Sequence, residues 1–95
     1  MTTPRPCNDN QGRTYPRYPG RNCVEVSRYL ASRYPELELR AGWLRWRGKG
    51  FAFGMPHAWN VNADGEIVDS TWRPSASTLE VEYVESEWWT RACSA

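Results

Sequence analysis

Residues 57–71 read HAWNVNADGEIVDST, and this stretch decides the fold because it predicts a β-hairpin with a defined register. Its centre, Asn62-Ala63-Asp64-Gly65, is typical of a type I turn followed by a left-handed glycine, which is the three-residue hairpin loop. With residues 63–65 as that loop, Asn62 faces Glu66 across the two strands. The register on both sides of the turn follows from this pairing.

The register brings two chemically useful side chains to one face of the hairpin. Trp59 faces Asp69 across the two strands. His57 lies on the same face of the hairpin and is diagonal to Asp69, a separation that a long side chain can span. A two-residue Asp-Gly loop would instead put His57 and Asp69 on opposite faces. The turn sequence favours the longer loop, so we expect the histidine and the carboxylate to meet.

A helix is predicted upstream, over residues 22–34. Its apolar residues recur at helical spacing along one face, and Pro35 ends it because the residue before a proline is driven out of the helical region. Asn22 is a favourable N-cap, and Glu25 follows three residues later. Cys23 therefore lies in the first turn of the helix.

Alternating residues predict further strands. Residues 37–46 alternate with a change of phase at Gly42, which suggests a bulge. A turn at residues 48–50 leads into a return strand that we expect to be interrupted at Gly54 and Pro56, and residues 78–84 form a last strand. Trp88 and Trp89 should pack on the body, but the sequence does not indicate where.

The predicted fold class is α+β, with the Cys23 helix packed on a small antiparallel sheet. Residues 1–20 are expected to form an extended arm, folded over the body by Tyr15 and Tyr18, and residues 21–95 a single domain. Nothing in the first twenty residues resembles a signal peptide, and no apolar run is long enough for a membrane span. The three cysteines form no closed disulfide framework, although a Cys7–Cys93 bridge would be possible outside a reducing compartment. We expect a cytoplasmic protein.

Cys23, His57 and Asp69 are the candidate catalytic residues. A thiol at a helix N-terminus is stabilised as a thiolate by unpaired N–H groups and the helix dipole. His57 is the only histidine in the chain, so any histidine-dependent chemistry must use it. Asp69 would orient the imidazole and stabilise its charged form. The plain alternatives are a buried apolar cysteine, an exposed strand histidine and a solvated carboxylate.

The order of these motifs resembles the transglutaminase-like core of the papain-fold superfamily. A cysteine opens the helix, His57-Ala58-Trp59 opens one strand, and Val68-Asp69-Ser70-Thr71 lies on the next, with Ala41-Gly42-Trp43 between. Small proteins of bacteria and their phages share this order, and the resemblance covers about residues 21–72. It departs from the family at Ser70, where a proline is usual.

The resemblance implies a thiol acyl-transfer enzyme that attacks an amide or ester carbonyl through a thioester. Water as the acceptor gives a peptidase, amidase or deamidase, and an amine gives a transamidase. The expected partner is a protein or peptide substrate, with no cofactor, metal, membrane or nucleic acid. No oxyanion donor follows from the pattern. The candidates for oxyanion or substrate contacts are Asn22, Trp59, Asn60, Gln11 and Tyr18, besides the Cys23 N–H.

Three other interpretations compete with this one. A zinc site from Cys7, Cys23, His57 and Cys93 has suitable ligands but lacks the short ligand spacings of known sites. A nucleic-acid surface would use the basic and aromatic residues of 43–51, but the net charge of +1 and the glutamates of 80–87 oppose it. The third alternative is a non-catalytic binding module that keeps the fold.

Overall fold

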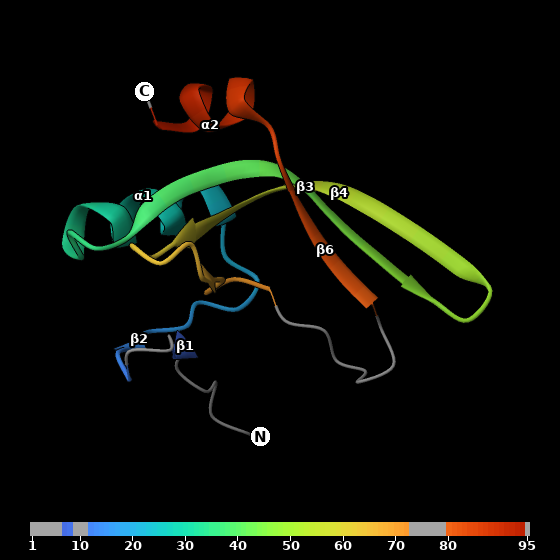
Figure 1. The fold of residues 1–95 in the computed structure, drawn as a ribbon, viewed down its shortest axis with the longest axis horizontal. Helices are drawn as coiled ribbons and strands as arrows, with labels where there is room; N and C mark the ends of the chain where they lie inside the picture. Colours follow the sequence, from blue (N-terminus) through green and yellow to red (C-terminus); the bar gives the residue numbers. More distant parts are fainter. Residues whose placement is uncertain (1–6, 9–11, 73–79, 95) are drawn as a thin grey trace.

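In the computed structural model of the protein, residues 7–8, 12–72 and 80–94 are described (Figure 1). These residues contain two helices, a two-stranded sheet and a four-stranded sheet, so the fold is a small α+β fold as predicted. In chain order the elements are β1 (Cys7–Asn8), β2 (Thr14–Tyr15), α1 (Cys23–Arg33), β3 (Glu38–Gly48), β4 (Phe51–Val61), β5 (Ile67–Val68), β6 (Glu80–Glu85) and α2 (Glu87–Ser94).

The four-stranded sheet is antiparallel throughout, with the order β5-β4-β3-β6. The predicted hairpin register is confirmed, because Asn60 pairs with Val68 and Val61 with Ile67. The loop is also the predicted one: Gly65 N–H donates to the Asn62 carbonyl at 2.9 Å, and Gly65 has a φ of +79°. Strand β5 consists of only two residues, and the ladder with β4 ends before Asp69.

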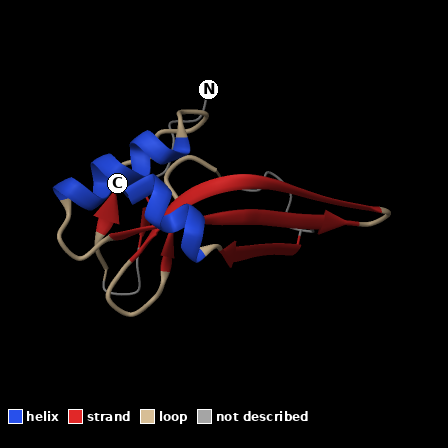
Figure 2. Ribbon diagram, turned by 90° about the horizontal axis from the view of Figure 1, so that it is seen from above, coloured by secondary structure: helices blue, strands red, loops and turns tan. Residues whose placement is uncertain are grey.

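Strands β3 and β4 form one long hairpin that extends away from the two helices (Figure 2). Their pairing is uninterrupted from Glu38 opposite Val61 to Gly48 opposite Phe51, so the predicted bulge at Gly42 and break at Gly54 were wrong. The change of phase has another cause. Leu39 and Ala41 are buried on the face that carries the helices, whereas Leu44 is buried on the opposite face, beside Tyr83. The sheet is covered on different faces along its length.

Pro56 is accommodated in β4 because its nitrogen faces an edge that needs no ladder bond. The N–H of Ala58, two residues later, points away from β3 towards Cys23. Alternate residues of a strand point the same way, so the Pro56 nitrogen faces that edge as well. Strand β5 pairs with β4 only at Asn60 and Val61, so within the described residues no strand lies beside Pro56.

Helix α1 begins and ends where the sequence predicts. Asn22 caps it by accepting hydrogen bonds from the N–H groups of Val24 and Glu25, at 3.0 and 3.1 Å. The fully buried Asn60 fastens the helix to β4 by donating from its side chain to the Ser27 carbonyl at 3.0 Å. Cys23 is thereby held at the edge of β4.

Helix α2 was not predicted. Ser86 accepts from the N–H of Trp89 at 3.3 Å, and the helix is fixed to β3 by Thr90, whose hydroxyl bonds both the N–H and the carbonyl of Ala41. The connection into α2 passes so close to Gly42 that a Cβ there would lie 2.0 Å from the Val84 carbonyl oxygen. Gly42 therefore allows β6 and α2 to approach the centre of the sheet.

The segment before α1, expected to be an arm, contributes to the body. Strands β1 and β2 pair with each other beneath the main sheet (Figure 1). Tyr15 is buried in a cluster with Leu30, Leu37 and Val68, and its hydroxyl donates to Glu36 at 2.8 Å. The backbone N–H of Tyr18 donates to the Ser70 carbonyl at 2.8 Å. Neither helix of the described residues is long and apolar enough to cross a membrane.

Candidate functional site

Cys23, His57 and Asp69 come from three different elements. Cys23 is the first residue of α1, His57 lies in β4, and Asp69 directly follows β5. His57 points to the face of the sheet opposite α1, where Asp69 also lies. Cys23 reaches it around the edge of β4, where the N–H of Ala58 also interacts with the thiol. The structure thus brings the three predicted residues together.

His57 and Asp69 form the best-defined contact of the site. His57 Nε2 lies 2.8 Å from Oδ2 of Asp69, and the side chains are 2% and 7% exposed. Since an ionised carboxylate only accepts, Nε2 is the donor, and Nδ1 is left to face the thiol. The ring of Trp59 lies nearly parallel to the imidazole at 6.3 Å and helps to fix its plane.

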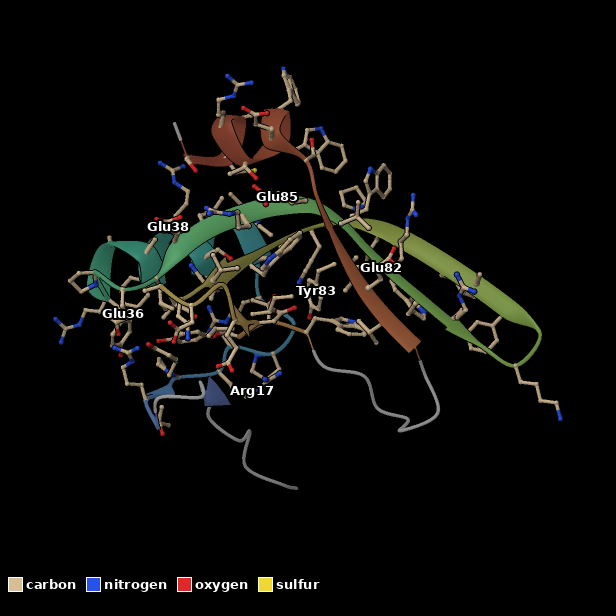
Figure 3. The ribbon with its side chains drawn as sticks, in the orientation of Figure 1. Arg17, Glu36, Glu38, Glu82, Tyr83 and Glu85 are labelled. Atoms are coloured by element: carbon tan, nitrogen blue, oxygen red, sulfur yellow. The ribbon has the colours of Figure 1, made fainter. Side chains whose placement is uncertain are left out.

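The Asp69 carboxylate is held by other donors as well. Oδ1 accepts from the backbone N–H groups of Thr71 and Trp72, both at 3.2 Å, and from the Thr71 hydroxyl at 3.4 Å. Oδ2 accepts from the Tyr83 hydroxyl at 2.7 Å as well as from His57. Tyr83 extends from β6 towards the middle of the molecule (Figure 3). The carboxylate therefore has little freedom to turn away from the imidazole.

Nδ1 of His57 is the one buried side-chain nitrogen or oxygen among the described residues that lacks a hydrogen-bond partner. The Cys23 thiol interacts with the imidazole, but not in ideal hydrogen-bond geometry. Cys23 is a half-buried free thiol, and it lines a pocket of about 340 Å³ together with His57. A buried polar atom without a partner is costly and rare, so the arrangement calls for a proton donor or acceptor at this point.

The electrostatics of the pair favour charge separation. The interaction with His57 lowers the pKa of the Cys23 thiol, with help from the N–H groups of Ala58 and Cys23, although burial opposes it. Burial alone would lower the pKa of His57, but the hydrogen bond to Asp69, the interaction with Cys23 and the negative charges of both groups outweigh it and raise that pKa to about 9. The lowered pKa of the thiol and the raised pKa of the imidazole both favour the thiolate–imidazolium form of the pair.

The other predicted contact residues are placed differently. Asn22 uses its side-chain oxygen to cap α1, and Asn60 is buried with its amide bonded to Ser27. Trp59 is only 3% exposed, so it packs against the imidazole and does not wall an open cleft. Tyr18 lines a separate pocket with Tyr29 and does not line the Cys23 pocket. Gln11 lies outside the described residues.

Two residues of the site were missed from the sequence. Tyr83 lies in the strand predicted over residues 78–84, but nothing local in the sequence links it to Asp69, fourteen residues earlier. Thr71 had a local signal, since an aspartate followed two residues later by threonine is typical of a side-chain-capped turn. Arg17 adds a contact from the N-terminal segment by donating to the Asp69 carbonyl at 3.1 Å.

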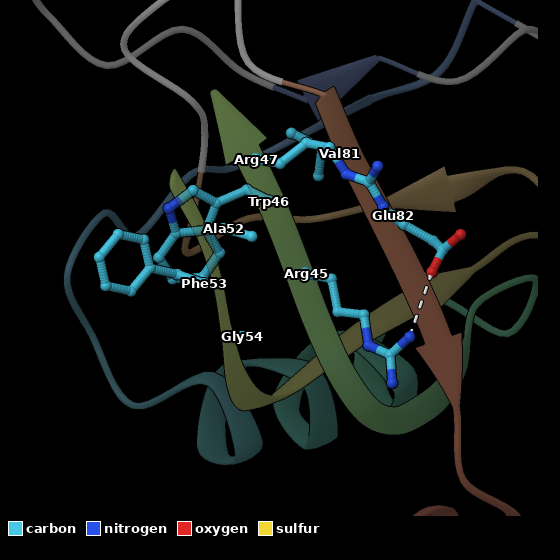
Figure 4. A pocket seen from close by; sticks show the side chains of 8 residues that line it. All are labelled: Arg45, Trp46, Arg47, Ala52, Phe53, Gly54, Val81 and Glu82. Carbon is cyan, nitrogen blue, oxygen red and sulfur yellow. Dashed lines mark ion pairs between the residues drawn. The ribbon is translucent and has the colours of Figure 1, made fainter. Parts of the chain in front are cut away.

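A second, larger pocket of about 420 Å³ lies on the outer half of the β3–β4 hairpin (Figure 4). Its lining includes Arg45, Trp46 and Arg47, three of the residues that suggested a nucleic-acid surface, together with Phe53. Arg45 forms an ion pair with Glu82 at 3.8 Å, so part of this positive charge is neutralised. The described residues that line this pocket include no cysteine, serine, threonine or histidine, so they lack the side chains that acyl transfer needs.

Across the described residues, no group of three or more histidine, cysteine, aspartate or glutamate side chains is arranged to hold a metal ion. Cys7 of the proposed zinc set has no described side chain. Comparison of the chain with protein-family models, with curated proteins and with solved structures gives no match. The function is therefore inferred from the geometry of the Cys23 site.

Proposed function

We propose that the protein is a thiol acyl-transfer enzyme of the papain/transglutaminase type, with Cys23 as nucleophile, His57 as general base and acid, and Asp69 as the orienting carboxylate. The observation that carries the proposal is the state of His57. Its Nε2 is bound to a firmly held carboxylate, while its buried Nδ1 has no partner and shares a pocket with a thiol. This is the arrangement that activates a cysteine through a histidine oriented by a third group.

The open geometry between the thiol and Nδ1 agrees with the proposal. Hydrogen bonds between a nucleophile and its base are often long or poorly aligned before substrate binds, and tighten in the complex. The thiol's place in the first turn of α1 adds the positive end of the helix dipole to the stabilisation by His57. The chemistry needs a free thiol, which fits a reducing compartment such as the cytoplasm.

The reaction would proceed in two balanced steps. The Cys23 thiolate attacks the carbonyl carbon of an amide or ester and forms a C–S bond, while the C–N or C–O bond breaks. The leaving amine or alcohol takes the proton from His57 Nδ1. In the second step water or an amine attacks the thioester, gives a proton to Nδ1, and displaces the thiolate, which restores the pair.

The oxyanion that forms in each step needs donors. The Cys23 N–H belongs to the first turn of α1, so it has no partner within the helix and is one donor for this site. The Asn22 side chain uses its oxygen for capping, which leaves its amide N–H groups as a second candidate donor. Asn60 is excluded from this role because its amide is buried against Ser27.

The test is the rate of cysteine alkylation by iodoacetamide between pH 5 and 10, with each modified cysteine located by mass spectrometry. A thiol with an ordinary pKa near 8.5 is only about 1% ionised at pH 6.5. We expect Cys23 to react at least tenfold faster than Cys93 at pH 6.5, because Cys93 is a half-buried free thiol of the same pocket without the histidine contact. His57→Ala should remove this advantage.

Asp69→Asn gives a second measurement that keeps the size of the side chain. This variant should lower the rate of Cys23 alkylation relative to that of Cys93 at pH 6.5. Circular dichroism should show that the variant is folded. A Cys23 thiol that is alkylated no faster than Cys93 at pH 6.5 in the folded wild type would reject the proposal, as would a faster alkylation of Cys23 that survives His57→Ala. The non-catalytic binding module would then be the better interpretation.

A further inference from the structure

The pocket beside Cys23 has a wall that the three proposed catalytic residues do not explain. Helix α2 supplies four of its lining residues, Trp88, Trp89, Ala92 and Cys93. Trp88 is 69% exposed, although it is the largest kind of apolar side chain. An exposed tryptophan at the rim of a pocket that contains a candidate nucleophile is suited to be covered by a ligand.

The position of this wall is fixed by the sheet. The Ser86 N–H donates to the Ala41 carbonyl at 2.8 Å, and the Thr90 hydroxyl makes two more bonds to the backbone of Ala41, at 3.0 and 3.1 Å. Trp89 packs against Trp43 with ring centroids 5.2 Å apart. The wall is therefore preformed, so a ligand would meet little ordering cost there.

The chemical character of the pocket limits what can enter. None of its lining residues is a lysine, arginine, aspartate or glutamate, and its only titratable groups are His57 and the two thiols. A charged group placed there would lose water without gaining an opposite charge, apart from the imidazolium already paired with Cys23 and Asp69. Its volume of about 340 Å³ is at the small end for ligand pockets.

We infer that the pocket between Cys23 and α2 binds the acyl group of the substrate, and that this acyl group is small, uncharged and apolar. The inference rests on the proposed function and deepens it. The acyl group stays bonded to the Cys23 sulfur in the thioester, so it must occupy space that the thiol itself lines. The leaving group departs after taking its proton from His57 and needs no such enclosure.

The test uses 4-nitrophenyl acetate, butyrate and hexanoate, which share one leaving group and differ only in the acyl chain. The kcat/KM of the wild type, corrected for the rate with Cys23→Ala, should rise about two- to fourfold per methylene, as expected for burial of CH₂ groups. The mono-4-nitrophenyl ester of succinate, which carries a carboxylate on a chain as long as butyrate, should react at least tenfold more slowly than butyrate.

Two variants of α2 connect this preference with the pocket. Ala92→Leu fills the pocket and should reduce the hexanoate-to-acetate ratio of kcat/KM at least fivefold. Arg91→Leu introduces the same side chain one position away, outside the pocket lining, and should leave the ratio within a factor of two. Circular dichroism and thermal melting show whether each variant folds.

The outcomes separate the two proposals. A wild type that forms the thioester with no dependence on acyl length, or with a preference for the charged ester, overturns the apolar acyl pocket and leaves the proposed function in place. Equal effects of Ala92→Leu and Arg91→Leu overturn it as well. The proposed function itself is contradicted by two results together. The folded wild type would hydrolyse every ester no faster than Cys23→Ala, and its Cys23 would be alkylated no faster than Cys93.

Discussion

Tyr83 donates a 2.7 Å hydrogen bond to Oδ2 of Asp69, the same oxygen that lies 2.8 Å from Nε2 of His57. The tyrosine belongs to β6, at the far edge of the sheet from β5. Its ring packs edge-on against Trp59 at 5.0 Å and lies 6.4 Å from the imidazole. Tyr83 is thus a positioning residue that ties the last strand to the carboxylate and to the ring the carboxylate orients.

Tyr83→Phe removes only the hydroxyl, so the packing of the ring is kept. We expect the free energy of unfolding to fall by about 1.5–3 kcal/mol, because a hydrogen bond to a charged group is lost and the carboxylate keeps one donor fewer. Tyr29→Phe is the matched control, since Tyr29 is 52% exposed and the change should cost less than about 0.5 kcal/mol. Urea denaturation of both variants measures the difference. Equal losses would contradict the importance of the Tyr83 bond.

The single histidine makes the charge state of the site directly measurable. His57 is the only histidine of the chain, so its ring signals in an NMR titration need no assignment among several. We expect a midpoint at about 9 in the wild type, the value to which Asp69 and Cys23 raise the His57 pKa against the effect of burial. Asp69→Asn removes the negative charge and should lower the midpoint by more than one pH unit. A wild-type midpoint near the ordinary 6.5 would mean that the imidazolium is not stabilised.

Stability should fall as the pH rises through the titration of His57. The folded-state pKa is raised above the unfolded value of about 6.5, so the folded protein holds a proton that the unfolded chain has lost. This contribution is complete below pH 6.5 and disappears as the pH rises through about 9. A Cys23→Ser background removes the thiol titration together with the part of the His57 shift that Cys23 contributes, so the free energy of unfolding should there fall by about 1–3 kcal/mol. Two variants are unfolded in urea at pH 6 and at pH 10: Cys23→Ser, and Cys23→Ser combined with His57→Gln. The difference between them in the pH dependence of the free energy of unfolding is the contribution of His57.

The hairpin that joins His57 and Asp69 could be predicted because local turn chemistry determines the register. A glycine with positive φ after an Asn-Ala-Asp run allows one loop length, and that length determines which side chains share a face. The first turn of α1 was equally predictable from the Asn22 cap. Together these local signals located all three residues of the candidate site.

What the sequence did not reveal depends on contacts between distant segments. The change of phase at Gly42 suggested a bulge, but its cause is that the helices cover one face of β3 while Tyr83 lies against the other. Pro56 suggested a break, but it is tolerated because its nitrogen faces an unpaired edge. Helix α2 is eight residues long, and it is held on the sheet by the hydrogen bond between Thr90 and the backbone of Ala41. These two residues are forty-nine positions apart, so no local pattern reveals the contact.

Gly42 tests whether the close approach of β6 and α2 is essential. A Cβ at this position would lie 2.0 Å from the Val84 carbonyl oxygen and 2.7 Å from the Ser86 nitrogen, and both are backbone atoms that cannot rotate away. We therefore expect Gly42→Ala to destabilise the protein by about 3 kcal/mol or more. The change should also shift α2 away from Cys23, so Cys93 and Cys23 should both become more accessible to a bulky maleimide.

Gly54→Ala is the control, because Gly54 is also a strand glycine but a Cβ there would meet nothing closer than Arg45 Cγ at 3.6 Å. It should change the free energy of unfolding by less than about 1 kcal/mol and leave both thiols as accessible as in the wild type. A Gly42→Ala variant as stable as Gly54→Ala would mean that β6 and α2 can retreat from β3 at no cost. The apolar wall that α2 forms beside Cys23 would then be mobile, and this result would contradict the inference that the pocket is preformed. If only Gly42→Ala is destabilised and its two thiols become more accessible, α2 can lie over the site only because residue 42 has no side chain.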